Sequence, residues 1–135
     1  MLKEKIIQFE VHSNSSGNLC VYESDDGVPF DIKRIFTVMA KKNEIRGNHA
    51  HKICQQLLVC VSGEIEVICD DGLNQRIYRL SEMGKGLLIP ARIWAFEKYI
   101  NEGSVLMVLC DQAYEKNDYI FNYEEFKKTI RIKIK

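Results

Sequence analysis

The chain has 135 residues, of which 46% are hydrophobic, and no internal repeat is visible along it. A chain of this length can bury one core but is too short for two independent domains, so we expect residues 1–135 to fold as one domain. The 19 Lys and Arg residues balance the 19 Asp and Glu residues. No net charge therefore attracts nucleic acid or an anionic membrane, and an anionic ligand would need locally placed cations.

The cysteines and the N-terminus indicate the compartment. An odd number of cysteines without Cys-x-x-Cys spacing, mostly inside apolar segments, is typical of reduced core residues in a cytosolic protein. Residues 1–5, Met-Leu-Lys-Glu-Lys, carry charges where a signal peptide has its apolar stretch, and no apolar run approaches the length of a membrane span. We therefore expect a soluble cytoplasmic protein. The cysteines are Cys20, Cys54, Cys60, Cys69 and Cys110.

Short segments rich in β-branched and aromatic residues predict a series of strands. They lie at residues 6–11, 19–23, 30–39, 53–61, 64–69, 75–80, 86–89, 94–99 and 104–109. Turn signals such as Ser15-Ser16-Gly17-Asn18 and Ser62-Gly63 separate them. This pattern favours an all-β fold, a closed antiparallel sandwich or jelly roll. In residues 122–128, a polar N-cap, acids in the first turn and bases in the last predict a short C-terminal helix.

Residues 46–52, Arg-Gly-Asn-His-Ala-His-Lys, are the most informative segment of the chain. Side chains at i and i+2 of a strand point to the same face, so His49 and His51 can converge on one cavity. Arg46 and Lys52 flank them as cations. The ordinary pKa of histidine suits proton transfer near neutral pH. The pair indicates either a metal site or an acid/base site.

The metal interpretation requires further ligands. Metal-binding cupin barrels combine a His-x-His pair with a glutamate shortly after it and a third histidine on a distant strand. Here Gln55 or Gln56 stands at the glutamate position, and residues 86–95 have the Gly and Pro of the second cupin motif but no histidine. His12 lies beside a polar loop and is expected to be exposed. Two imidazoles and a neutral amide bind a divalent metal poorly, so we expect neither metal nor cofactor.

Without a metal, the strand can act as a proton-transfer face. A neutral His49 or His51 can take a proton from a carbon next to a carbonyl, while nearby donors stabilise the oxygen of the enolate. Alternatively, one histidine is a core residue and the other a surface residue. The polar and cationic neighbours of the pair make the strand unusually hydrophilic for an ordinary core strand.

The sequence resembles the dTDP-4-keto-6-deoxyglucose 3,4-ketoisomerases over nearly its whole length, from Phe30 to Phe126. The resemblance implies a metal-independent, cupin-type double-stranded β-helix (jelly roll) that forms homodimers by exchanging N-terminal strands. It also implies that the keto group of a dTDP-linked 4-keto-6-deoxy sugar moves from C4 to C3, before an aminotransferase makes a 3-amino sugar. The resemblance rests on residues 46–52, 56–63, 70–72, 85–90, 93–94, 114–120 and 123–126.

The resemblance also assigns roles to individual residues. His49 and His51 become the acid/base pair, one removing the C3 proton and the other returning a proton at C4. Arg46 fits a clamp on the sugar or pyrophosphate, because the planar donor fork of arginine suits phosphate oxygens. Arg92 and Trp94 are expected to line the pocket wall. The further substrate-binding candidates are Arg34, Lys52, Asn48, Gln55 and Thr37.

Two departures from the family pattern qualify these roles. Ser16 stands where the family commonly has an arginine, which leaves one phosphate contact without its usual residue. Thr37 stands where a tyrosine is common, so Thr37 or a water would have to take the place of the phenol. The alternatives are a dTDP-sugar 3,5-epimerase of the related cupin type, a non-catalytic sugar-nucleotide-binding cupin and a metal-dependent cupin oxygenase.

Overall fold

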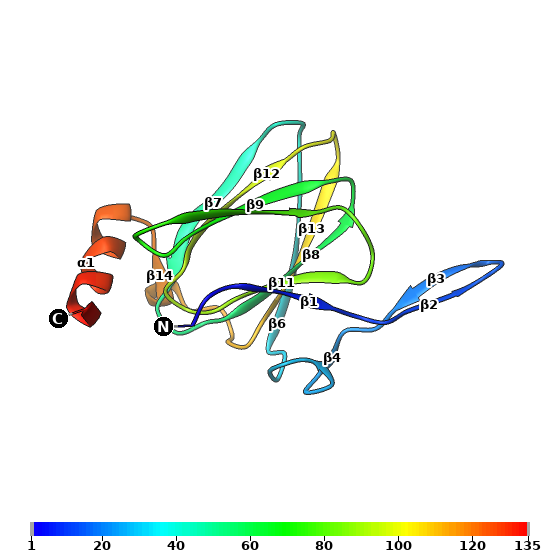
Figure 1. The fold of residues 1–135 in the computed structure, drawn as a ribbon, viewed down its shortest axis with the longest axis horizontal. Helices are drawn as coiled ribbons and strands as arrows, with labels where there is room; N and C mark the ends of the chain where they lie inside the picture. Colours follow the sequence, from blue (N-terminus) through cyan, green and yellow to red (C-terminus); the bar gives the residue numbers. More distant parts are fainter. Residues whose placement is uncertain (1, 135) are drawn as a thin grey trace.

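A computed structural model describes residues 2–134, with side chains described as far as Ile130; residues 1 and 135 of the expected domain lie outside it. Two five-stranded sheets face each other in a jelly roll, and neighbouring strands within each sheet are antiparallel (Figure 1). The first sheet has the order β1 (Lys5–Gln8), β11 (Lys85–Ile89), β8 (Gln56–Ser62), β13 (Ser104–Cys110) and β6 (Arg34–Ala40). The second has the order β10 (Gln75–Leu80), β9 (Ile65–Asp70), β12 (Trp94–Tyr99), β7 (Ile45–His51) and β14 (Tyr119–Ile120).

From β6 to β13 the chain passes back and forth between the two sheets, except at the hairpin of β9 and β10. The predicted all-β, cupin-type class is therefore confirmed. None of the helices in the described range is long and apolar enough to span a membrane. The remaining elements are β2 (Val11–Asn14), β3 (Gly17–Cys20), β4 (Glu23–Ser24), β5 (Gly27–Val28), the 3₁₀ turn η1 (Lys116–Asp118) and α1 (Tyr123–Ile134).

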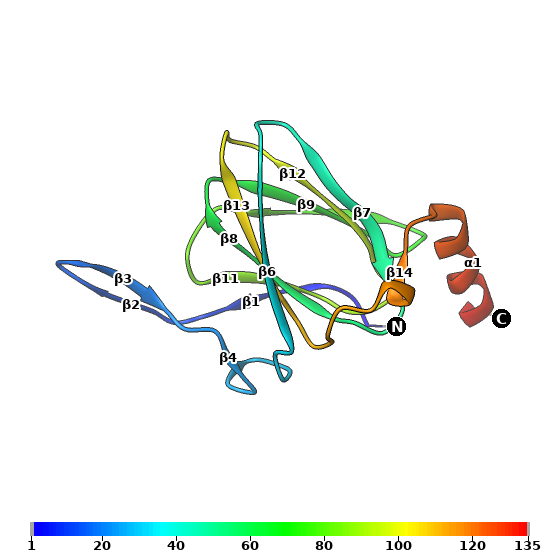
Figure 2. The same ribbon diagram turned by 180° about the vertical axis from the view of Figure 1, so that it is seen from behind.

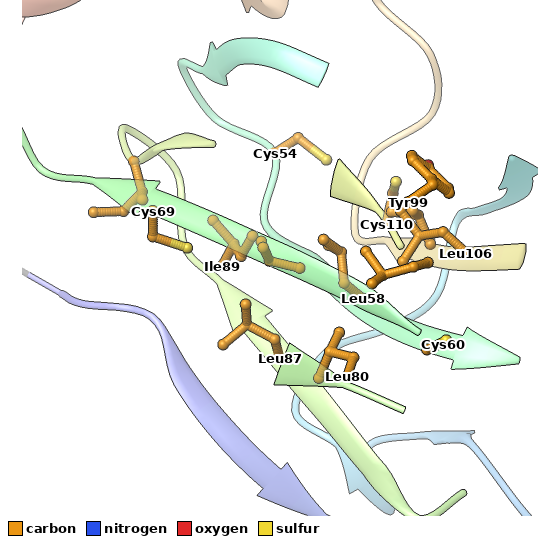
Figure 3. Close-up of a cluster of buried hydrophobic side chains, with 14 residues drawn as sticks. Cys54, Leu58, Cys60, Cys69, Leu80, Leu87, Ile89, Tyr99, Leu106 and Cys110 are labelled. Carbon is orange, nitrogen blue, oxygen red and sulfur yellow. The ribbon is translucent and has the colours of Figure 1, made fainter. Parts of the chain in front are cut away.

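The main core lies between the two sheets. Strand alternation turns Leu58 and Cys60 of β8 and Leu87 and Ile89 of β11 inward (Figure 3), where they meet residues of β9 and β10. These side chains are at most 5% exposed, and burial of such a side chain stabilises the fold by about 1.5–3 kcal/mol. The interior is filled here, whereas the space between β6, β13, β7 and β12 contains a cavity.

The N-terminal region differs from the prediction of one strand over residues 6–11. The backbone N–H of Phe9 donates to the carbonyl of Gly84 at 2.7 Å, which ends β1 and redirects the chain. Strands β2 and β3 then form a hairpin that projects from the body of the molecule (Figures 1 and 2). Strand β1 pairs with β11 of its own chain. The expectation that two chains exchange their N-terminal strands stays a prediction.

The C-terminal helix is longer than predicted and packs over the end of the second sheet, where β7 ends and β12 begins. Asn122 caps it, because its side-chain oxygen accepts the backbone N–H of Glu125 at 3.0 Å. Phe126 and Ile130 of α1 pack in one buried cluster with Trp94 and Ile120. The helix thus buries this end of the second sheet on its outer face. Helix α1 lies at the end of the molecule opposite the β2–β3 hairpin (Figures 1 and 2).

Candidate active site

A cavity of about 250 Å³ opens between the two sheets at the histidine strand. Its apolar wall comes from inward-facing residues of β6 and β13, and its polar wall comes from β7, β12 and the start of β8. Such a combination of apolar walls and a few converging polar groups is typical of a small-molecule site. The lining residues are Phe36, Val38, Arg46, Gly47, His49, Gln56, Glu97, Tyr99, Leu106, Val108 and Tyr119.

A β-bulge at Asn48 determines which side chains of β7 reach the cavity. Ala95 pairs with His49 while the next residue of β12 pairs with Gly47, so Asn48 is an extra residue in β7. It adopts a left-handed conformation with φ 56°. The inserted residue shifts the alternation by one, which places Arg46 on the same face as His49. Asn48 itself is exposed and does not line the cavity, contrary to its proposed role in substrate binding.

The two imidazoles lie side by side, as their i and i+2 spacing predicts. The ring centroids of His49 and His51 are 5.0 Å apart, with an interplanar angle of 86°. His49 lines the cavity, whereas His51 lies beside it and is 5% exposed. The Tyr119 ring packs against both, with centroid distances of 5.1 Å to His49 and 4.4 Å to His51. Each imidazole thus packs against the other and against Tyr119, which fixes the orientations of the two rings.

Asp118 fixes the tautomer of His51 through a hydrogen bond. The Nδ1 atom of His51 lies 2.8 Å from Oδ2 of Asp118. The backbone N–H groups of Ile53 and Cys54 donate to the same carboxylate at 2.7 and 3.4 Å. An ionised carboxylate only accepts hydrogen bonds, so in neutral His51 the proton is on Nδ1 and the lone pair is on Nε2. Among the described residues this buried Nε2 atom has no hydrogen-bond partner.

Both histidines are neutral at neutral pH. Burial lowers the pKa of His49 to about 4, and the neighbouring His51 acts in the same direction. Burial also lowers the pKa of His51, although the Asp118 carboxylate opposes this effect. Burial acts to raise the pKa of Asp118, but the hydrogen bonds from His51 and the two backbone amides hold it below its ordinary value. A neutral imidazole can accept a proton, as a general base must.

Glu97 and Asp118 are two carboxyl groups at the site that the sequence interpretation did not identify. In residues 94–99 the apolar Trp94 and Phe96 alternate with Ala95 and Glu97. This pattern suggests that the aromatic face is the inner one, but the structure turns Ala95, Glu97 and Tyr99 inward. Asp118 lies far from His51 in the sequence and in no predicted strand. The two residues meet because β14 pairs with β7, and such a long-range pairing leaves no pattern in either short segment.

Two of the arginines proposed from the sequence lie at the site. Arg46 lines the cavity and pairs in register with Glu97. The Arg34 guanidinium packs 5.5 Å from the Phe36 ring centroid, and its Nη2 donates to the Sγ of Cys110 at 3.5 Å. Its charge is close enough to contribute to the lowered pKa of His51. Both arginines therefore place a cation near the histidine pair.

Two other proposed residues point away from the cavity. Trp94 packs against Tyr123 and Phe126 beneath α1, so the pocket wall assigned to it is wrong: strand alternation turns it to the opposite face of the sheet. Thr37 is exposed, and its neighbours Phe36 and Val38 take the inner face of β6. Thr37 therefore does not replace the tyrosine in this cavity.

The last three candidates lie in connections between strands. Gln55 precedes β8, and Gln56 lines the cavity in its place. Lys52 is exposed, and its backbone N–H donates to the carbonyl of Asp118 at 2.8 Å. Arg92 does not line the cavity; it has φ 68°, and its backbone N–H donates to the carbonyl of His51 at 2.7 Å. Lys52 and Arg92 thus support the histidine strand through their backbones.

One group of described residues has metal-ligand chemistry. Ligand atoms of His51, Cys54 and Asp118 lie within 4.8 Å of one another. However, the His51 Nδ1 and Asp118 Oδ2 atoms are already joined by a hydrogen bond, and the other carboxylate oxygen accepts from Ile53. A metal would have to replace these bonds, and the Cys54 thiol, whose pKa is raised, would have to ionise. The donor set therefore fits a hydrogen-bonded histidine–aspartate pair better than a metal centre.

Comparison with known proteins agrees with this arrangement. The sequence model of the FdtA family, described as WxcM-like, C-terminal, matches residues 2–131. The chain belongs to the FdtA family. Among its relatives is the TDP-4-oxo-6-deoxy-α-D-glucose-3,4-oxoisomerase of Aneurinibacillus thermoaerophilus. The two are 36% identical over 130 residues, which cover 96% of this chain and 94% of that protein.

Solved structures of FdtA-like enzymes have the same fold. QdtA, a sugar 3,4-ketoisomerase from Thermoanaerobacterium thermosaccharolyticum solved with TDP, matches with a TM-score of 0.94, 29% identity and 98% of each chain covered. A histidine-to-asparagine variant of QdtA has been solved with TDP-4-keto-6-deoxyglucose. A 3,4-ketoisomerase from Helicobacter canadensis matches with a TM-score of 0.93 and 32% identity, covering 97% of this chain and 99% of that one.

Proposed function

We propose that this FdtA family member is a dTDP-sugar 3,4-ketoisomerase, with residues 1–135 acting as one cytoplasmic domain. It moves the keto group of dTDP-4-keto-6-deoxyglucose from C4 to C3 and supplies a 3-keto sugar for amination. The observation that carries the proposal is the neutral His49–His51 pair at the cavity, with Asp118 behind His51. The names and bound ligands of the relatives support the choice of substrate.

In the proposed reaction, His49 is the base because it lines the cavity directly. It takes the C3 proton, and the electron pair of the C–H bond forms the enediolate. His51 takes up a proton from solvent on Nε2 and delivers it at C4, while Asp118 stabilises the imidazolium. His49 releases the C3 proton to solvent, so both histidines are neutral again after each turnover. Arg46 holds the sugar or pyrophosphate oxygens at the cavity.

Incubation with dTDP-4-keto-6-deoxyglucose, followed by carbon NMR of the carbonyl, tests the proposed function. We expect the C4 carbonyl signal to be replaced by one at C3. An inverted carbon centre with the ketone still at C4 would identify an epimerase instead. A protein that binds the nucleotide but leaves the C3 hydrogen unexchanged in D₂O would be a non-catalytic binder.

Arg46→Ala should weaken nucleotide-sugar binding, whereas Arg46→Lys should weaken it less. Loss of hydrogen bonds to a charged group costs about 1.5–3 kcal/mol, or roughly 10- to 150-fold in Kd. Calorimetric titration with dTDP measures the effect. Lys52→Ala is the matched control, because Lys52 is an exposed cation outside the cavity. Wild-type affinity in both Arg46 variants would mean that another cation holds the ligand.

We propose further that the protein is a homodimer in which the β2–β3 hairpin of each chain reaches the other. Ile35, Met39 and Val61 lie on the outer face of the first sheet, with 57%, 70% and 59% of each residue exposed. On the same face, a groove of about 230 Å³ is lined by Val61 and by residues at the base of the hairpin. A projecting hairpin next to an uncovered apolar groove favours a second copy of the chain as the partner.

Sedimentation should give about twice the 15.7 kDa chain mass. Val61→Glu should raise the dimer dissociation constant by roughly 10- to 100-fold or more, because it places an unpaired charge in the interface. Ile77→Glu is the control, because Ile77 is similarly exposed but lies on β10 of the other sheet. A wild-type monomer at micromolar concentration would contradict the proposal, as would equal behaviour of the two variants.

A further inference from the structure

Glu97 is a buried carboxyl group for which the proposed histidine chemistry provides no role. It lies on the inner face of β12, opposite Arg46 of β7 and Val67 of β9, and it lines the cavity. The residue is partly accessible because it borders the cavity, but its Oε2 atom is buried and has no hydrogen-bond partner among the described residues. Buried polar atoms are almost always hydrogen-bonded, so this atom calls for an explanation.

The fold leaves space for this carboxyl group at Gly47. A Cβ atom at position 47 would collide with Oε2 of Glu97 and lie 3.2 Å from the Cα of Phe96. Gly47 also has φ +97°, a conformation that residues with a side chain rarely adopt. The backbone next to His49 is therefore shaped around the Glu97 carboxyl group.

The groups around Glu97 favour its neutral form near pH 7. Burial raises its pKa to about 8, although the Arg46 guanidinium opposes this shift. Tyr99 on the same strand and Cys69 on β9 have raised pKa values and stay neutral, and His49 across the cavity is neutral as well. Arg46 is thus the charged group facing Glu97 among these neighbours. A neutral carboxyl group carries a proton donor and an acceptor side by side.

The proposed reaction needs such a group. Moving the ketone from C4 to C3 removes a proton from C3 and adds one to C4, and it also adds a proton to the C4 oxygen and removes one from the C3 oxygen. The histidines serve the two carbons. Gln56, another polar residue of the cavity, can donate a hydrogen bond, but an amide does not release a proton near neutral pH.

We propose that Glu97 is a third catalytic residue, which donates its hydroxyl proton to the C4 oxygen while its other oxygen accepts the proton of the C3 hydroxyl. The O–H bonds of Glu97 and of the C3 hydroxyl break, and O–H bonds to the C4 oxygen and to Glu97 form. Glu97 is again a neutral acid after each turnover, so the step needs no additional reactant. This inference rests on the proposed ketoisomerase function.

The pH dependence of the wild-type enzyme provides the first test. kcat/KM for dTDP-4-keto-6-deoxyglucose should fall as the pH rises through about 8, because ionised Glu97 can no longer donate a proton. Tyr99 and Cys69 stay neutral in this range because their pKa values are raised. A profile that is flat from pH 7 to 9.5 would overturn the proposal without the need for any variant.

Glu97→Gln provides the second test, because glutamine has the same shape and hydrogen-bonding ability but cannot transfer a proton. We expect kcat to fall by roughly 10²–10⁴-fold, while dTDP affinity stays within about threefold of wild type. The fall of kcat/KM near pH 8 should be absent in this variant. Exchange of the C3 hydrogen with D₂O should exceed isomerisation, since His49 remains. Glu66→Gln, on the outer face of the neighbouring strand β9 and paired with Arg79, should behave like wild type.

Wild-type kcat in Glu97→Gln would overturn the role of Glu97 while leaving the ketoisomerase function intact. Equal losses of C3 exchange, isomerisation and dTDP binding would also overturn it, because they would indicate a structural role. If Glu97→Gln does not fold, the wild-type pH profile alone decides. A wild-type protein that does not isomerise the sugar would instead refute the proposed function, so the two failures are distinguishable.

Discussion

His49→Asn should lower kcat for dTDP-4-keto-6-deoxyglucose by roughly 10²–10⁴-fold, the usual effect of losing a general acid or base. His49 lines the cavity and is neutral, because burial and His51 lower its pKa to about 4. Asparagine can keep a local hydrogen bond, so fold and dTDP affinity should be retained. Steady-state kinetics, with circular dichroism and dTDP titration as controls, measures the effect.

Hydrogen exchange separates the roles of the two histidines. If His49 is the base at C3, His49→Asn should neither isomerise the sugar nor exchange its C3 hydrogen with D₂O. His51→Asn should be slow in isomerisation but should still exchange that hydrogen. In the wild type, the acid limb of kcat/KM should lie near pH 4, well below the ordinary histidine value of 6.5. Wild-type turnover in both variants would show that the pair is structural.

Asp118→Asn should also lower kcat by roughly 10²–10⁴-fold, although Asp118 does not line the cavity. Its Oδ1 accepts the backbone N–H of Ile53 at 2.7 Å, so an asparagine would keep its oxygen there and turn its NH₂ group towards His51. The Nδ1 atom of His51 would then have to accept a hydrogen bond, and the proton would move to Nε2. His51 would then lack the Nε2 lone pair that takes up the proton for C4, and a neutral imidazole is too weak an acid to supply that proton itself.

Nitrogen NMR of the histidine ring reports this change directly. We expect the Nδ1–H tautomer of His51 in the wild type and the Nε2–H tautomer in Asp118→Asn, with similar melting temperatures. Asp118→Ala is the comparison for stability, because it leaves two backbone N–H groups without their acceptor, at a cost of about 1–3 kcal/mol. Turnover within threefold of wild type in Asp118→Asn would show that the aspartate does not control His51.

Local patterns in the sequence were sufficient for most strands of the two sheets and for the histidine pair, but not for the break of the N-terminal strand at Phe9. The alternation of a strand depends only on neighbouring residues, so His49 and His51 share a face wherever the strand lies. The position of the capping residue of α1 is local too, and Asn122 begins the helix as predicted. The helix extends beyond its predicted end at residue 128, because Ile130 packs against the sheet and stabilises a further turn.

Long-range contacts decided the rest of the candidate site. Alternation places Trp94 and Glu97 on opposite faces of β12 but does not tell which residue faces the interior, because α1 also buries the outer face at Trp94. The bulge at Asn48, visible only in the pairing of β7 with β12, brings Arg46 to the side of His49. Asp118 reaches His51 because β14 pairs with β7, a contact between segments that are distant in sequence. Such contacts depend on how the sheets close around the core, which no short stretch of residues encodes by itself.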